Sequence, residues 1–195
     1  MRCHFPGKTL LDSLIHLPLV LPPVVVGYLL LLSFGRRGAI GEWLYDWFGF
    51  SFTFSWRGAA LASAIIAFPL LVRAIRLALE GVDRRLEQAA RTLGANPLRV
   101  FFTITLPLIL PGIIVGMVLA FARSLGEFGA TITFVSNIPG KTRTIPLAMY
   151  TLIETPGAEI AAARLCIIGI ILALLSLLFS EWLTRYSRKR LGAMC

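Results

Sequence analysis

Four stretches of the chain are long and apolar enough to cross a lipid bilayer as helices. A spanning helix needs about 20 predominantly apolar residues. The candidates lie at residues 14–34, 54–72, 106–122 and 165–183. In the first, Pro18, Pro22 and Pro23 are expected to kink or unwind the helix. The pattern predicts an all-α integral membrane protein with about four spans, in which residues 1–195 form one transmembrane domain.

Residues 73–105, between the second and third spans, follow an amphipathic pattern. The apolar positions recur at spacings of three and four, which predicts one apolar face of a short helix. They are Val82, Leu86, Ala89, Ala90 and Leu93. Gly94 follows as a helix stop, and Asn96-Pro97 has the form of an N-cap and a first helical residue. The segment therefore predicts helix, turn and helix, with Leu106-Pro107 starting the third span.

The composition supports a membrane protein. Hydrophobic residues make up 57% of the chain and charged residues 15%, with a mean hydropathy of +0.80. A soluble domain averages roughly 45–50% apolar and about a quarter charged residues. The net charge of +9 suggests nucleic acid as one partner, but in a membrane chain basic residues more often mark cytoplasmic loops.

The distribution of basic residues predicts the orientation of the chain. With four spans, residues 1–13, the 73–105 loop and the C-terminal tail lie on one side, and they hold most of the 19 lysines and arginines. The positive-inside rule places these segments in the cytoplasm and residues 123–164 outside. The start is not a secretory signal, because its apolar run is long and proline-broken and lacks a small-residue cleavage site.

Few residues offer chemistry for catalysis or metal binding. Cys3, Cys166 and Cys195 have no metal-ligand spacing, and His4 and His16 have no cysteine or carboxylate cluster beside them. We therefore expect no metal site. An integral membrane enzyme would need a group of His, Asp or Glu residues on facing spans, and of these types the predicted spans hold only His16 and Glu181, both near ends.

The PGKT sequence at 139–142 resembles part of a phosphate-binding loop. A phosphate-binding loop has two glycines five residues apart, the second directly before the lysine. In this chain the second would be Gly140, and the first position is occupied by Val135. The sequence therefore predicts no ATP site in this chain.

Three interpretations of the 73–105 segment compete. Its small-residue helix has the shape that docks into a partner's groove. A basic amphipathic helix also fits the inner leaflet surface. A DNA-binding helix-turn-helix is a third, but its second helix, PLRVFFTITLP, has one arginine and two phenylalanines and continues into the membrane. That helix presents almost nothing to base edges.

The same segment resembles the cytoplasmic loop of ABC-class importer permeases. The family pattern is Glu-Ala-Ala, three residues, Gly, nine residues, Ile, one residue and Leu-Pro. The matching residues are Ala89, Ala90, Gly94, Ile104, Leu106 and Pro107. Gln88 stands where the acid is usual, with Glu87 adjacent, so a salt bridge from that position is in doubt. The resemblance implies that Glu87, Gln88 and Arg91 belong to the ATPase-coupling loop with the matching residues.

Other stretches resemble the molybdate permeases within this family. The distinctive ones are LPLVLPPVVVGY at 17–28 and GEFGATITFVSNIPG at 126–140, and the shorter GEFGA is also similar to sulfate permeases. Family members usually carry another apolar helix before the FPGK sequence at 5–8, where this chain begins. That implies either a longer parent chain or a variant with one span fewer.

The resemblance implies a function and partners. The chain would be the permease subunit of a bacterial inner-membrane importer of molybdate, with sulfate, thiosulfate or tungstate as alternative substrates. It would form a homodimer within membrane lipid, without nucleic acid. An ABC ATPase would hold the ATP and magnesium, a periplasmic molybdate-binding protein would deliver the anion, and this chain would carry no cofactor and no catalytic residue.

Four charged residues are candidates for the anion path. Arg123 and Glu127 lie four residues apart in an otherwise apolar stretch, and ionisable residues in a membrane are functional candidates. An ordinary ion pair at a helix end is the alternative. Lys141 and Arg143 in the outer segment could attract the anion, contact the binding protein or remain solvated loop charges.

Overall fold

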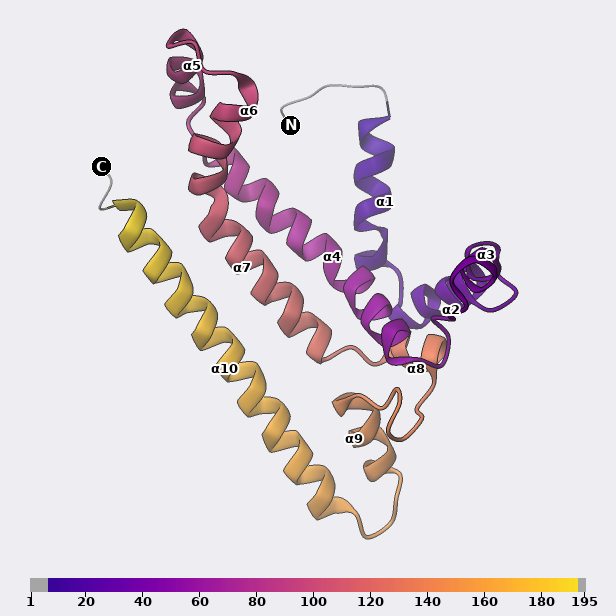
Figure 1. The fold of residues 1–195 in the computed structure, drawn as a ribbon. Coiled ribbons are helices and arrows are strands. Elements are labelled where there is room, and N and C mark those ends of the chain that lie inside the picture. The colour runs from indigo at the N-terminus through magenta and orange to yellow at the C-terminus, as the bar shows by residue number, and fades with distance from the viewer. Residues whose placement is uncertain (1–6, 193–195) are drawn as a thin grey trace. The chain divides into compact units, whose positions relative to one another are not determined.

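The computed structural model describes residues 7–192, except for the side chains of residue 180 and residues 184–192. Every regular element in this range is a helix, which confirms the predicted fold class (Figure 1). In chain order these are α1 (Lys8–Val20), α2 (Pro23–Phe34), α3 (Ala39–Phe48), α4 (Trp56–Glu80), α5 (Arg84–Thr92), α6 (Pro97–Val100), a π-helical turn η1 (Phe101–Thr105), α7 (Leu106–Leu125), α8 (Gly129–Val135), α9 (Ile145–Ile153) and α10 (Glu159–Gly192). Cys3, His4 and Cys195, considered above as possible metal ligands, lie outside the described residues.

Three described helices are long and apolar enough to cross a membrane. They are Trp56–Glu80, Pro97–Leu125 and Glu159–Leu183. Helices α1 and α2 meet at a bend of 116°. They supply a fourth crossing if the two together count as one broken span. The count of about four agrees with the sequence. The helices extend beyond the predicted ranges: the broken first span begins at Lys8, α4 continues to Glu80, the third span begins at Pro97, and the fourth begins at Glu159.

The chain forms two compact units, each described by itself. Unit 1 comprises Met1–Pro69 and Arg123–Ile171, and unit 2 comprises Leu70–Ala122 and Leu172–Cys195.

Unit 1 is organised around α2, the first part of α4 and α8. The chain breaks between α1 and α2 because Pro22 and Pro23 have no N–H to continue the helix, and Leu21 and Pro22 adopt extended conformations. The core comprises Val26, Leu30, Ala59, Ala62, Ile66, Ala130, Phe134 and Val135. The short helix α8 thus contributes three of the core side chains, although the sequence places it in the outer segment.

Glycine and alanine allow α2 and α8 to approach closely. A Cβ atom on Gly27 would lie 2.7 Å from the carbonyl oxygen of Ala130 and 2.8 Å from its Cα. Because these atoms belong to the backbone, they cannot move aside without shifting α8. Small residues at such crossings are typical of helices packed in membranes.

We expect the Gly27→Ala variant to be less stable than the wild type. The added methyl overlaps the α8 backbone, and overpacking of this kind costs about 1–3 kcal/mol. Thermal unfolding of the purified protein in detergent would show a lower Tm. Gly169→Ala in α10 is the control, since a Cβ atom there meets nothing within 4 Å. Equal Tm values for both variants would contradict this account of the packing.

In unit 2, the C-terminal part of α4 packs against α7 through small side chains. A Cβ atom on Gly112 would overlap that of Ala78, and one on Gly116 would lie 2.8 Å from the Cβ of Ala74. Glycines spaced by four on one helix and alanines spaced by four on the other bring the two backbones together. The segment α5–α6 lies beyond the end of α4 and the start of α7 (Figure 1).

Candidate functional site

The helix α5 has well-defined ends. Asp83 is the N-cap, and its Oδ1 accepts a hydrogen bond of 2.9 Å from the backbone N–H of Arg85. At the other end Gly94 has φ +82°, a conformation that glycine adopts without strain. The N–H groups of Gly94 and Ala95 donate to the carbonyls of Arg91 and Ala90, which is a Schellman turn. The helix stop predicted at Gly94 is therefore present.

The next helix begins as predicted but does not stop before the third span. Asn96 Oδ1 accepts a hydrogen bond of 3.3 Å from the N–H of Leu98, and Pro97 is the first helical residue. The helix then passes through η1, where the N–H of Leu106 donates to the carbonyl of Phe101, into α7. Pro107 has no N–H for the carbonyl of Thr103, and a π-helical turn is one way to accommodate such an interruption. Leu106-Pro107 thus lies within a continuous helix rather than at its start.

The apolar face predicted for α5 is divided in the structure. Val82 is buried at 8% exposure and Ala90 is half-buried, so these two point inward. Leu86, Ala89 and Leu93 are exposed, Leu93 at 88%. These three residues form the exposed apolar face of α5. The division arises because α5 turns the side that carries Glu87 and Ala90, rather than the centre of the apolar face, toward the rest of unit 2.

Glu87 connects α5 to the start of the third span. Its Oε1 accepts a hydrogen bond of 2.7 Å from the hydroxyl of Thr105, which is 3% exposed. Sequence reasoning placed Glu87 in the loop but missed Thr105, because the two residues are 18 apart and no periodic pattern relates them. The other predicted loop residues divide by exposure: Gln88 and Arg91 are exposed, whereas Ile104, Leu106 and Pro107 are partly buried.

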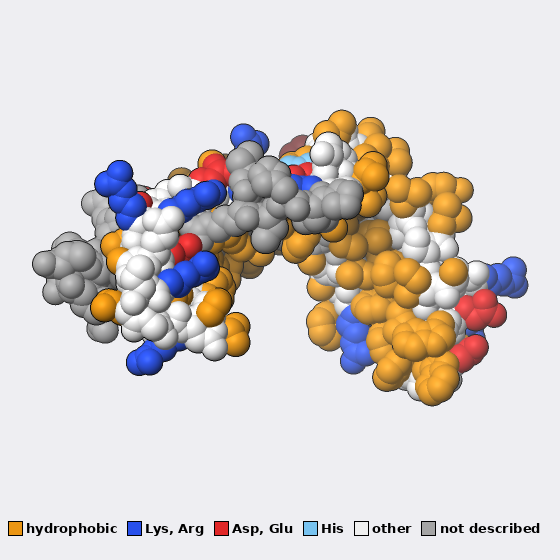
Figure 2. All heavy atoms as spheres, turned by 90° about the horizontal axis from the view of Figure 1, so that it is seen from above, with side chains coloured by type: hydrophobic (Ala, Val, Ile, Leu, Met, Phe, Trp, Pro, Cys, Tyr) orange, Lys and Arg blue, Asp and Glu red, His pale blue; other side chains and the backbone are white. Residues whose placement is uncertain are grey.

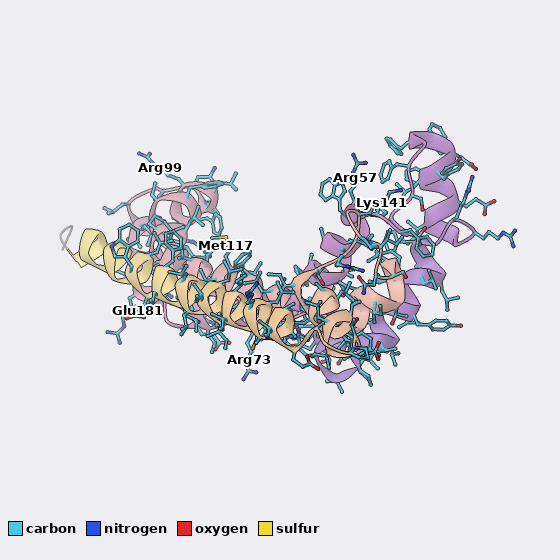
Figure 3. The ribbon with its side chains drawn as sticks, turned by 90° about the horizontal axis from the view of Figure 1, so that it is seen from below. Arg57, Arg73, Arg99, Met117, Lys141 and Glu181 are labelled. Atoms are coloured by element: carbon cyan, nitrogen blue, oxygen red, sulfur yellow. The ribbon has the colours of Figure 1, made fainter. Side chains whose placement is uncertain are left out.

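Basic side chains surround this segment. Figure 2 shows them in blue around α5 and α6, and Arg99 projects away from α6 in Figure 3. The exposed ones are Arg84, Arg85, Arg91 and Arg99. The segment therefore combines an exposed apolar face with a strongly positive surface.

In unit 1, Arg123 and Glu127 form a shielded ion pair. The Nη1 of Arg123 lies 2.8 Å from the Oε2 of Glu127, whose side chain is 1% exposed, against 34% for Arg123. The other carboxylate oxygen accepts a hydrogen bond of 2.9 Å from the N–H of Ala130 in the first turn of α8. Both oxygens of Glu127 thus hold the end of α7 and the start of α8 in place.

Lys141, which is labelled in Figure 3, lies in the loop between α8 and α9. Arg143 lies in the same loop, and both side chains are exposed. The Nε of Arg143 donates to Asn137 Oδ1 at 3.0 Å, and Asn137 in turn donates to Thr151 in α9. Among the described hydrogen bonds, none joins this group to the Arg123–Glu127 pair. Asn137 carried no sequence signal of its role, since an asparagine in a loop is common.

The same outer segment is also held by Tyr150 of α9. Its ring lies against Phe128, with centroids 5.2 Å apart. A hydrogen bond to the Glu154 carboxylate raises the pKa of the Tyr150 phenol above 10.0, because ionisation would place two negative charges side by side.

Comparison with known proteins gives consistent results. The family model described as "Binding-protein-dependent transport system inner membrane component" matches residues 1–192. The chain is 79% identical over 192 residues to the molybdenum transport system permease protein ModB of Escherichia coli K12, covering 98% of this chain and 84% of that protein. It is 68% identical over 191 residues to the ModB of Haemophilus influenzae, covering 98% and 83%.

The chain is also similar, at lower identity, to a sulfate permease and to an alginate transporter. The sulfate transport system permease protein CysT of Escherichia coli K12 is 38% identical over 193 residues, covering 98% of this chain and 69% of that protein. A crystal structure of a bacterial ABC transporter that imports alginate matches with a TM-score of 0.70 and 18% identity, covering 95% of this chain and 68% of that chain. At such low identity this structural similarity supports the fold alone.

Proposed function

The chain belongs to the family of binding-protein-dependent transport system inner membrane components, and on this premise we propose that it is the permease subunit of an ATP-driven molybdate importer. The observation that carries the proposal is the 79% identity over 98% of the chain to a molybdenum transport permease. The apolar helices Trp56–Glu80, Pro97–Leu125 and Glu159–Leu183 supply the membrane crossings. It is a multi-pass protein of the inner membrane.

The energy comes from a partner ATPase that docks on α5. The support is the exposed docking face of Leu86, Ala89 and Leu93 on a helix whose other exposed side chains are mostly polar or charged. Apolar side chains on a short amphipathic helix suit a groove in another protein. In this proposal the chain has no ATP site of its own, and nucleotide and magnesium remain on the ATPase.

The α5–α6 segment and both termini face the cytoplasm. The exposed arginines at 84, 85, 91 and 99 favour this side, because short loops rich in lysine and arginine remain there. The outer segment, with Lys141 and Arg143, then faces the periplasmic binding protein that delivers molybdate.

The permease works as a homodimer embedded in lipid. The long helix α10 presents apolar side chains such as Ile167, Ile170 and Leu174, which are exposed when this chain is described alone. Lipid chains and a second copy are the environments that accept such a surface in a membrane. We expect no nucleic acid among the partners.

The substrate is tested by uptake. In cells that lack their own molybdate permease but keep its ATPase and binding protein, expression of this chain is expected to restore uptake of radioactive molybdate. A large excess of sulfate should leave the rate unchanged. Sulfate permeation is the alternative, supported by the 38% identity to a sulfate permease. Sulfate uptake without molybdate uptake would contradict the proposal.

A further inference from the structure

We propose that Thr105 is a positioning residue that holds the coupling helix α5 to the third membrane span through Glu87, so that movement of the docking face reaches α7. The inference rests on the proposed function and assigns a role to one contact within it. The contact is the 2.7 Å hydrogen bond from the Thr105 hydroxyl to the Glu87 carboxylate.

The backbone alone connects α5 to α7 weakly. The route passes through Gly94, whose φ of +82° marks a turn, and through the two residues that follow it. Turns of this kind are the places where helices rotate relative to one another. The Glu87–Thr105 bond bypasses the turn and joins the first half of α5 to the last residue of η1.

The bond is well placed to resist a pull. Thr105 is 3% exposed and Glu87 is half-buried, so water competes little for either group. A hydroxyl that donates to an ionised carboxylate also makes a stronger bond than one between neutral groups. Movement of α5 is therefore transmitted to α7 through a shielded side-chain hydrogen bond as well as through the backbone.

The neighbouring threonine shows that this arrangement is specific. A helical threonine commonly donates to a carbonyl of the preceding turn. Thr103 does this, with its hydroxyl 2.6 Å from the carbonyl of Arg99, and it is exposed. Thr105, two residues later in the same π-helical turn, donates to another helix instead. The pair supplies a test variant and a matched control.

The test uses Thr105→Val, which removes the hydroxyl and keeps the shape of the side chain. The complete transporter, with its ATPase and binding protein, is reconstituted in lipid vesicles with radioactive molybdate. We expect the ATPase to co-purify as with the wild type, while the ATP hydrolysed per molybdate transported rises about tenfold, as for loss of a hydrogen bond to a charged group. Thr105→Ser should restore the wild-type ratio, and Thr103→Val should not change it.

Glu87→Leu removes the bond from the other side and is expected to raise the same ratio. It serves as the second variant in case Thr105→Val does not fold. An unchanged ratio in either folded variant would overturn the inference, as would failure of Thr105→Ser to restore it. Loss of ATPase co-purification in Thr105→Val would also overturn it, because the bond would then shape the docking face rather than transmit movement. Failure of the proposed function is distinguishable, since the wild-type vesicles would then transport no molybdate.

Discussion

Replacing Leu93 with glutamate is expected to abolish co-purification of the ATPase with this chain. Leu93 is 88% exposed at the end of α5, so the substitution removes almost no packing within the protein itself. In the proposed complex the same position enters an apolar contact, where a carboxylate without a partner is costly. Loss of a central interface side chain costs about 2–4 kcal/mol, which is roughly thirtyfold to several hundredfold in affinity.

The measurement is co-purification of the ATPase with a tagged permease from membranes, together with the yield of inserted permease. Arg84→Glu is the matched control, because it introduces the same side chain near the start of α5, away from the docking face. Arg84 is exposed and lies in the first turn, where a negative side chain is favourable. Retention of the ATPase by Leu93→Glu, or its equal loss in both variants, would contradict docking through this face.

The end of α5 and the start of α6 could be predicted from the sequence, because they depend on local interactions. A left-handed glycine at 94 and an Asn-Pro pair at 96–97 favour the same turns in any surrounding. The rotation of α5 about its axis is different, since tertiary packing decides it. Val82 and Ala90 point inward while Leu93 is exposed, a division that helical periodicity alone cannot give.

Some prolines in this chain break a helix and others lie inside one, and the sequence alone does not tell the two cases apart. Pro22 and Pro23 end one helix and start another at a bend of 116°, whereas Pro107 and Pro111 lie inside continuous helical structure. The difference arises from what surrounds each proline. The turn η1 accommodates the missing N–H at Pro107, while two consecutive prolines leave the first break with no local compensation.

The burial of the short helix α8 is the feature of the fold that was hardest to predict from the sequence. Its residues lie in the predicted outer segment, yet Ala130, Phe134 and Val135 are fully buried. Their burial depends on the close approach of α2 at Gly27, far away in the chain. The same distance explains why the Arg123–Glu127 pair could be predicted from its spacing while its attachment to α8 could not.

Replacing Glu127 with leucine is expected to destabilise unit 1 severely. The change leaves Arg123 without its carboxylate and the N–H of Ala130 without its acceptor, at the point where α7 connects to α8. Because Arg123 is 34% exposed, water compensates part of its lost ion pair, and the expected cost is that of losing a hydrogen bond to a charged group, about 1.5–3 kcal/mol. The measurement is thermal unfolding of the purified permease in detergent, where the variant should unfold at a much lower Tm or fail to accumulate in membranes.

A double variant separates this structural role from a place on the anion path. In Arg123→Met with Glu127→Gln, neither side chain is charged, and the amide oxygen can still accept from the N–H of Ala130. Stability should therefore return toward the wild-type value, as when a buried ion pair is replaced as a whole. If the pair serves the fold alone, molybdate uptake returns with stability, and we expect this outcome. A stable double variant without uptake would instead place the Arg123–Glu127 pair on the path of the anion, because only the two lost charges would distinguish the variant from the wild type.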